Sequence, residues 1–114
     1  MSDTKLTMTM LFVFGGRQEI VDASKAYARC VLENPSLLES TTAEQFRSYF
    51  PLSELTPIDM FIRTGNHPCL SDAPLWHLAY SELFFSDTLW PDFSVEELMN
   101  SIEEFNQRER RYGL

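Results

Sequence analysis

The chain has 114 residues, the size of one small domain. Its 17 acidic and 9 basic residues give a formal net charge of −8, a field that repels phosphodiester backbones and so excludes a nucleic-acid-binding protein. Two cysteines without CxxC spacing, no signal-peptide pattern and no apolar run near ~18 residues predict a cytoplasmic protein in a reducing compartment.

The first predicted element is a strand over residues 6–14, LTMTMLFVF. Its second half is apolar on both faces, which is typical of a strand buried inside a parallel sheet. Gly15-Gly16 ends this strand, and a helix follows up to about Glu33, where Asn34-Pro35 stops it. The residues that indicate this helix recur at helical spacing: Ile20, Ala23, Tyr27 and Val31.

The middle of the chain adds a short helix and a strand. The segment 40–42, Ser-Thr-Thr, precedes Glu44 and Gln45 in a capping-box pattern, which predicts a short helix through Tyr49. Residues 58–62 form a short apolar run and predict a second strand. The order strand, helix, helix, strand favours parallel pairing with a right-handed crossover.

The last third predicts a helix from about Pro74 to Ser81, a very short strand over residues 82–85, and a long amphipathic helix. Ser94 with Glu97 forms the capping box that begins the long helix. The fold class is therefore α/β, a partial parallel-sheet layer flanked by helices, in one domain over residues 1–114. Such a narrow sheet cannot cover its own apolar faces, so another element must complete it.

Polar side chains at the ends of the predicted strands mark a candidate site. Arg63 and Arg17 each follow a strand, and open α/β sheets bind ligands outside the carboxyl ends of their strands. Paired guanidinium groups suit a diphosphate, Ser71 adds a hydroxyl, and Glu82 offers a carboxylate for Mg²⁺. By spacing alone this is a weak signal, and arginines that merely form surface ion pairs are the better explanation.

Two other local patterns do not predict a functional site. His67, Cys69 and His77 lack both a fourth ligand and a standard spacing, so we reject a zinc site. Arg108 and Arg110 are interpreted as the solvated end of the last helix.

Several motifs nevertheless form an ordered, specific set: FGGRQEIVDA, IRTG, LSD, LW, AYSELFFSDTLWPDF and NQRERRYG. This set resembles the C-terminal half of the cis-prenyltransferases, the family that includes undecaprenyl and dehydrodolichyl diphosphate synthases. The first motif is similar to the family's Tyr-Gly-Gly-Arg region. The resemblance covers nearly the whole chain.

The resemblance implies an activity, a cofactor and partners. Isopentenyl diphosphate would condense with an allylic diphosphate to form a cis-polyprenyl diphosphate, with Mg²⁺ as cofactor. The chain would work as a homo- or heterodimer with a cis-prenyltransferase chain, and its lipid product would bring it into peripheral membrane contact.

The resemblance also implies roles for individual residues. Arg63 and Ser71 match residues that hold isopentenyl diphosphate, and Glu82 matches the carboxylate that contacts magnesium. Arg111-Tyr112-Gly113 is similar to the family's C-terminal Arg-X-Gly, so Arg111 and Gly113 would reach the partner's diphosphate.

The sequence also departs from the family pattern. The family's Asp-Gly-Asn segment is absent, so the allylic-diphosphate half is missing and activity would need a partner chain carrying it. Cys69 stands where a second diphosphate-binding arginine is expected, and Val13 replaces an asparagine. The alternatives are a non-catalytic dimerisation or regulatory subunit and a truncated synthase fragment.

Overall fold

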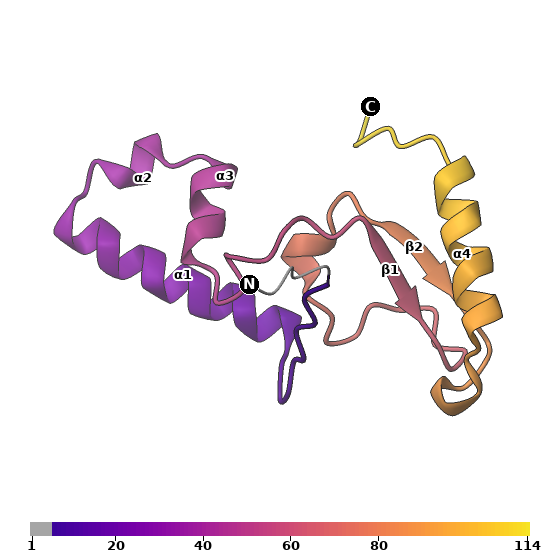
Figure 1. Cartoon of the computed structure of the whole chain (residues 1–114). Helices are drawn as coiled ribbons and strands as arrows, with labels where there is room; N and C mark the ends of the chain where they lie inside the picture. Colours follow the sequence, from indigo (N-terminus) through magenta and orange to yellow (C-terminus); the bar gives the residue numbers. More distant parts are fainter. Residues whose placement is uncertain (1–5) are drawn as a thin grey trace, which may run out of the picture.

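The computed structural model describes residues 6–114, and Figure 1 shows their arrangement. One group of helices lies on one side of the molecule, and the sheet with the last helix lies on the other. The elements in chain order are α1 (Gly16–Glu33), α2 (Leu37–Ser40), α3 (Ala43–Phe46), the 3₁₀ helix η1 (Arg47–Tyr49), β1 (Met60–Arg63), the 3₁₀ helix η2 (Leu75–Leu78), β2 (Glu82–Phe85), the 3₁₀ helix η3 (Trp90–Asp92) and α4 (Val95–Gln107).

The chain is extended rather than compact. Its radius of gyration is 17.3 Å, whereas a compact domain of this length would have one of about 13 Å. Large apolar surfaces therefore stay uncovered. None of the helices formed by residues 6–114 is both long enough and apolar enough to cross a lipid bilayer.

The helix boundaries follow local sequence signals. The side chain of Thr42 accepts a hydrogen bond from the Gln45 amide at the start of α3, and Ser94 accepts one from the Glu97 amide at the start of α4. Both capping boxes are confirmed. α1 ends at Glu33 as predicted, because the next residues are Asn-Pro and Pro cannot continue the ladder.

The sheet consists of β1 and β2, paired in parallel. Met60 is opposite Glu82 and Arg63 is opposite Phe85. The prediction of two short parallel strands in these regions is confirmed, and the crossover between them carries η2.

The predicted strand at residues 6–14 is wrong for this structure. Figure 1 shows this segment, in indigo, as an irregular stretch leading into α1, and it joins no sheet within residues 6–114. Its apolar side chains are exposed, among them Met8 at 78% and Phe12 at 76%. A strand needs a hydrogen-bonded neighbour, and neither β1 nor β2 is paired with this segment.

The predicted helix over 74–81 is shorter than expected. Only η2 forms, with the His77 amide donating to the Pro74 carbonyl at 3.0 Å and the Ser81 amide to the Leu78 carbonyl at 3.0 Å. The chain must leave the helix by residue 81, because the Glu82 amide already donates to the Asp59 carbonyl at 2.8 Å to begin β2.

The core lies where α1, η1 and η2 meet. Ala23, Phe50 and Leu78 are buried there, and the Phe50 and Trp76 rings lie 5.0 Å apart. Tyr27 and Phe46 extend this aromatic cluster with ring centroids 5.5 Å apart. The cluster holds the helical half together and fixes η2 against α1.

A buried acid and a histidine cross this core. The side chains of Glu19 and His77 are 1% and 3% exposed, and the His77 Nε2 lies 3.0 Å from the Glu19 Oε2. The same carboxylate oxygen accepts a hydrogen bond from the Leu52 amide at 3.0 Å. Glu19 thus links α1, η2 and the turn after η1.

Candidate functional site

Arg63 ends β1 and begins the loop to η2. Its Nη1 donates to the Cys69 carbonyl oxygen at 2.9 Å, which closes the loop on itself. The Gly65 amide donates to the Thr88 carbonyl at 2.9 Å, which ties the loop to the segment after β2. Arg63 is half-buried and its side chain makes one hydrogen bond within residues 6–114, so its remaining guanidinium donors are available to a ligand.

The loop is held in a backbone conformation that side chains rarely adopt. Gly65, Asn66 and Ser71 have φ values of 91°, 59° and 50°. A strained backbone conformation of this kind is kept only where the surrounding hydrogen bonds and packing hold it in place. Such conformations are concentrated at functional sites. The structure therefore brings Arg63 and Ser71 into one constrained loop, with Ser71 exposed.

Glu82 begins β2, and its carboxylate lies 3.7 Å from the Arg108 guanidinium. It lines a hollow of about 290 Å³ together with residues 109–113. Arg111 is among these, with a side chain 69% exposed and an ion pair to Glu109 at 3.3 Å. Glu82, Arg111 and Gly113 thus border one small hollow.

The two groups lie at opposite ends of the strand pair. Arg63 is at the carboxyl end of β1, and Glu82 is opposite Met60 at its amino end. Three residue-to-residue steps along the strand separate them, about 10 Å along the axis. Arg17 lies in the first turn of α1 and follows no strand, because residues 6–14 do not join the sheet.

One of these residues has the chemistry of a magnesium ligand. Among residues 6–114 no group of three or more His, Cys, Asp or Glu side chains is placed to hold a metal. Of the five residues predicted for the site, Glu82 alone offers a carboxylate, and magnesium is commonly held by one or two carboxylates plus substrate phosphates. Glu82 fits as one ligand, and the others must come from elsewhere.

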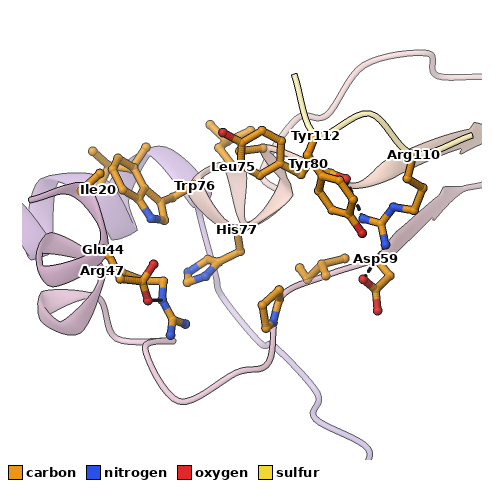
Figure 2. Close-up of a pocket in the computed structure, with 14 residues that line it drawn as sticks. Ile20, Glu44, Arg47, Asp59, Leu75, Trp76, His77, Tyr80, Arg110 and Tyr112 are labelled. Atoms are coloured by element: carbon orange, nitrogen blue, oxygen red, sulfur yellow. Dashed lines mark hydrogen bonds and ion pairs between the residues drawn. The ribbon is translucent and has the colours of Figure 1, made fainter. Parts of the chain in front are cut away.

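Arg108 and Arg110 are not a solvated helix end, contrary to expectation. The Arg108 guanidinium lies 4.0 Å from the centre of the Phe84 ring. The side chain of Arg110 is 18% exposed, and its Nη1 lies 2.8 Å from the Asp59 Oδ1, as Figure 2 shows. The hydrogen bond to Asp59 raises the pKa of Arg110 above its ordinary value. Arg108 and Arg110 lie two positions apart just after α4, where the backbone is extended, so their side chains fall on the same side of the segment. This spacing is the sequence signal that could have indicated their contacts with the strands.

A wider groove adjoins the hollow that Glu82 and Arg111 border, and Tyr80, Arg110 and Tyr112 line both. It has a volume of about 770 Å³ and runs between the helical half and the C-terminal segment. Figure 2 shows Trp76 and His77 at one end and Tyr80, Arg110 and Tyr112 at the other. None of the five residues singled out by the resemblance lines it, so the groove is not the predicted diphosphate site.

Comparison with known proteins decides the family. The prenyltransferase family model, described as undecaprenyl diphosphate synthase, matches residues 1–113. The chain belongs to this family. Family membership and the α/β architecture with its parallel strands agree with the expectations from sequence.

Relatives of this family come from distant organisms. The chain is 40% identical over 110 residues to a (2E,6E)-farnesyl-diphosphate-specific ditrans,polycis-undecaprenyl-diphosphate synthase of Acinetobacter baylyi, covering 96% of this chain and 44% of that protein. It is 41% identical over 113 residues to a GGDP-specific tritrans,polycis-undecaprenyl-diphosphate synthase of Sulfolobus acidocaldarius, covering 96% of this chain and 42% of that protein.

A solved structure shows the same fold. Lavandulyl diphosphate synthase from Lavandula x intermedia, crystallised with dimethylallyl diphosphate, is similar with a TM-score of 0.80 and 26% sequence identity. The match covers 88% of this chain and 43% of that one. The chain thus spans less than half the length of the family members that it matches.

Proposed function

We propose that this chain is the isopentenyl-diphosphate-binding part of a cis-prenyltransferase, which condenses isopentenyl diphosphate with an allylic diphosphate into a cis-polyprenyl diphosphate. It does so together with a partner chain that carries the Asp-Gly-Asn half. The observation that carries the proposal is the family match over residues 1–113. We propose that the reaction takes place in the cytoplasm, with peripheral membrane contact through the lipid product.

Uncovered apolar surface supports the need for a partner. The exposed side chains of residues 6–14 would be buried if a neighbouring strand paired with that segment. On the other side, Leu98, Met99 and Ile102 of α4 are 37%, 56% and 36% exposed. Contiguous apolar surface of this kind marks a contact with another chain or segment.

The loop after β1 supports the choice of ligand. In a chain of net charge −8, an anion is attracted only where cations are concentrated locally. Arg63 supplies a rigid fork of donors that fits a diphosphate, and the exposed Ser71 adds a hydroxyl. In a site shielded from water by a partner, these contacts are stronger than at an open surface.

The separation of the two groups supports a site shared between chains. Arg63 and Glu82 lie at opposite ends of the strand pair, about 10 Å apart along the strand axis. Arg111 and Gly113 border the same hollow as Glu82. We infer that this end of one chain meets the Arg63 loop of another, where Glu82 would hold magnesium. Magnesium would neutralise diphosphate charge when bound.

Co-expression with a chain that carries the Asp-Gly-Asn half tests the proposal. We expect incorporation of radiolabelled isopentenyl diphosphate into polyprenyl product well above that of the partner alone. Arg63→Ala should abolish the gain. Arg29→Ala is the matched control, because Arg29 is exposed on α1 and pairs with no acidic side chain among residues 6–114.

Two results would overturn the proposal. One is turnover no higher than that of the partner alone. The other is a complex in which Arg63→Ala is as active as the wild type. Either would leave a non-catalytic dimerisation subunit as the explanation of the family match.

A further inference from the structure

The segment after α4 has an alternating pattern of contacts. The Arg108 Nη1 donates to the Leu83 carbonyl at 3.2 Å, and Arg110 turns toward the start of β1. Glu109 and Arg111, which lie between and after them, are exposed and pair only with one another within residues 6–114. Alternation of this kind is expected of an extended segment lying on a surface. The two inward arginines therefore attach the segment, and Arg111 faces away.

Arg110 is the central attachment. Its Nη1 donates to the Asp59 carboxylate at 2.8 Å, and its Nη2 donates to the Tyr80 carbonyl at 2.8 Å. Asp59 immediately precedes β1, and Tyr80 lies two residues before β2. One guanidinium thus ties the C-terminal segment to the starts of both strands.

Aromatic rings enclose this guanidinium. Its carbon lies 4.6 Å from the centre of the Tyr112 ring and 5.4 Å from that of Phe105. The Tyr80 and Tyr112 rings lie 6.0 Å apart, and Figure 2 shows them on one side of Arg110. The Arg110 Nε is buried and has no partner within residues 6–114, so the stem of the side chain is desolvated. Arg110 and Tyr112, the residues before and after Arg111, are both held by these contacts, and this restricts the position of the Arg111 backbone.

The chain turns sharply just beyond this point. The Leu114 amide donates to the Arg111 carbonyl at 2.9 Å, with φ of 51° at Tyr112 and 84° at Gly113. A Cβ at Gly113 would lie 3.5 Å from the Tyr80 ring, an ordinary contact distance, so lack of space does not require glycine here. The positive φ of this residue is what favours glycine. The turn fixes the direction of residue 111 from its other side.

We propose that Arg110 is a positioning residue: by binding Asp59 and the Tyr80 carbonyl it holds the exposed guanidinium of Arg111 ready for a diphosphate bound by the adjoining chain. The proposal rests on the proposed function for the identity of the ligand. Its structural part, attachment of the segment through Asp59, does not depend on that ligand. Pre-placing a flexible arginine reduces the entropy lost when the anion binds.

Limited trypsin digestion of the chain tests the attachment. Asp59→Asn removes the carboxylate and leaves the sequence around the cleavage sites unchanged. We expect cleavage after Arg110 and Arg111 to become faster by about fivefold or more, because an arginine must leave its contacts to enter the protease. Cleavage after Arg29 in α1 should keep its rate. Asp22→Asn is the matched control, since Asp22 is an exposed acid on α1.

Three digestion outcomes decide the structural part. Selective acceleration at the C-terminal sites supports it. An unchanged rate there overturns it. Equal acceleration after Arg29 also overturns it, because Asp59 would then stabilise the whole domain instead of this segment. Arg110→Gln provides a second test. We expect it to accelerate trypsin cleavage after Arg111 and to leave cleavage after Arg29 unchanged.

Kinetics of the assembled enzyme test the link to Arg111. Asp59→Asn should raise the KM for isopentenyl diphosphate by about tenfold with kcat within about twofold. A purely structural loss would lower kcat and leave KM unchanged. Arg111→Gln should raise KM similarly, and the double variant should be no worse than Arg111→Gln alone, since both act through one contact.

Failure of the two proposals can be told apart. No turnover by the wild-type complex would overturn the proposed function while the digestion result still reports the attachment. Normal wild-type turnover with an unchanged KM in Asp59→Asn would overturn the positioning role alone.

Discussion

Replacing Gly16 by alanine should separate α1 from the loop that carries Ser71. Gly16 is the first residue of α1, and its amide donates to the Asp72 carbonyl at 3.2 Å. A Cβ there would lie 1.8 Å from the Ala73 carbonyl oxygen and 2.9 Å from the Ala73 carbonyl carbon. Both are backbone atoms, so no change of rotamer relieves the clash, and either the loop or the helix must move.

Two opposing effects determine how Gly16→Ala changes the free energy of unfolding. Alanine in place of glycine within a helix gains up to about 1 kcal/mol of helix propensity. Overpacking costs about 1–3 kcal/mol, and contact with rigid backbone lies at the upper end of that range. We therefore expect Gly16→Ala to lose about 2 kcal/mol. Gly15→Ala is the matched control, because a Cβ there would lie 3.7 Å from the Gln18 Cβ with φ of −131°, and we expect a change within about 1 kcal/mol.

Urea denaturation followed by tryptophan fluorescence measures the difference, since Trp76 packs in the core beside Phe50. With an m-value near 2 kcal/mol/M, a loss of about 2 kcal/mol lowers the midpoint by about 1 M. A Gly16→Ala midpoint equal to that of the wild type or of Gly15→Ala would refute the close approach of α1 to residue 73.

Two further stability predictions use the same denaturation assay. His77→Leu should cost about 3 kcal/mol, because it leaves the buried Glu19 carboxylate without its imidazole partner; Glu19→Gln keeps an acceptor for the Leu52 amide and should cost about 1 kcal/mol. Equal losses in the two variants would contradict the view that the buried Glu19 side chain depends on its contact with His77. Ser94→Ala removes the side-chain acceptor at the start of α4 and should cost about 1 kcal/mol with reduced helical circular dichroism, and full retention of both would rule out the cap.

The arrangement of the residues proposed for the site was only partly predictable from the sequence. Arg63 and Ser71 belong to one loop, as their closeness in sequence suggests. The position of Glu82 depends on the register of β1 against β2, which sequence spacing does not specify for two such short strands. Arg110 was missed because its partner Asp59 lies 51 positions away in the sequence.

Glu19 shows the same limit in the core. It lies four residues before the buried Ala23, on the same face of α1, so helical spacing places a carboxylate among apolar side chains. That position requires a partner, but only the packing of η2 against α1 identifies His77 as that partner.

Sequence alone determined the features that depend on neighbours along the chain. The capping boxes at Thr42 and Ser94 and the end of α1 at Glu33 follow from hydrogen bonds and steric clashes within a few residues. The tertiary structure decided the state of residues 6–14. Their composition suits a buried strand, but a strand exists only where another backbone offers its donors and acceptors, and within residues 6–114 no strand does so.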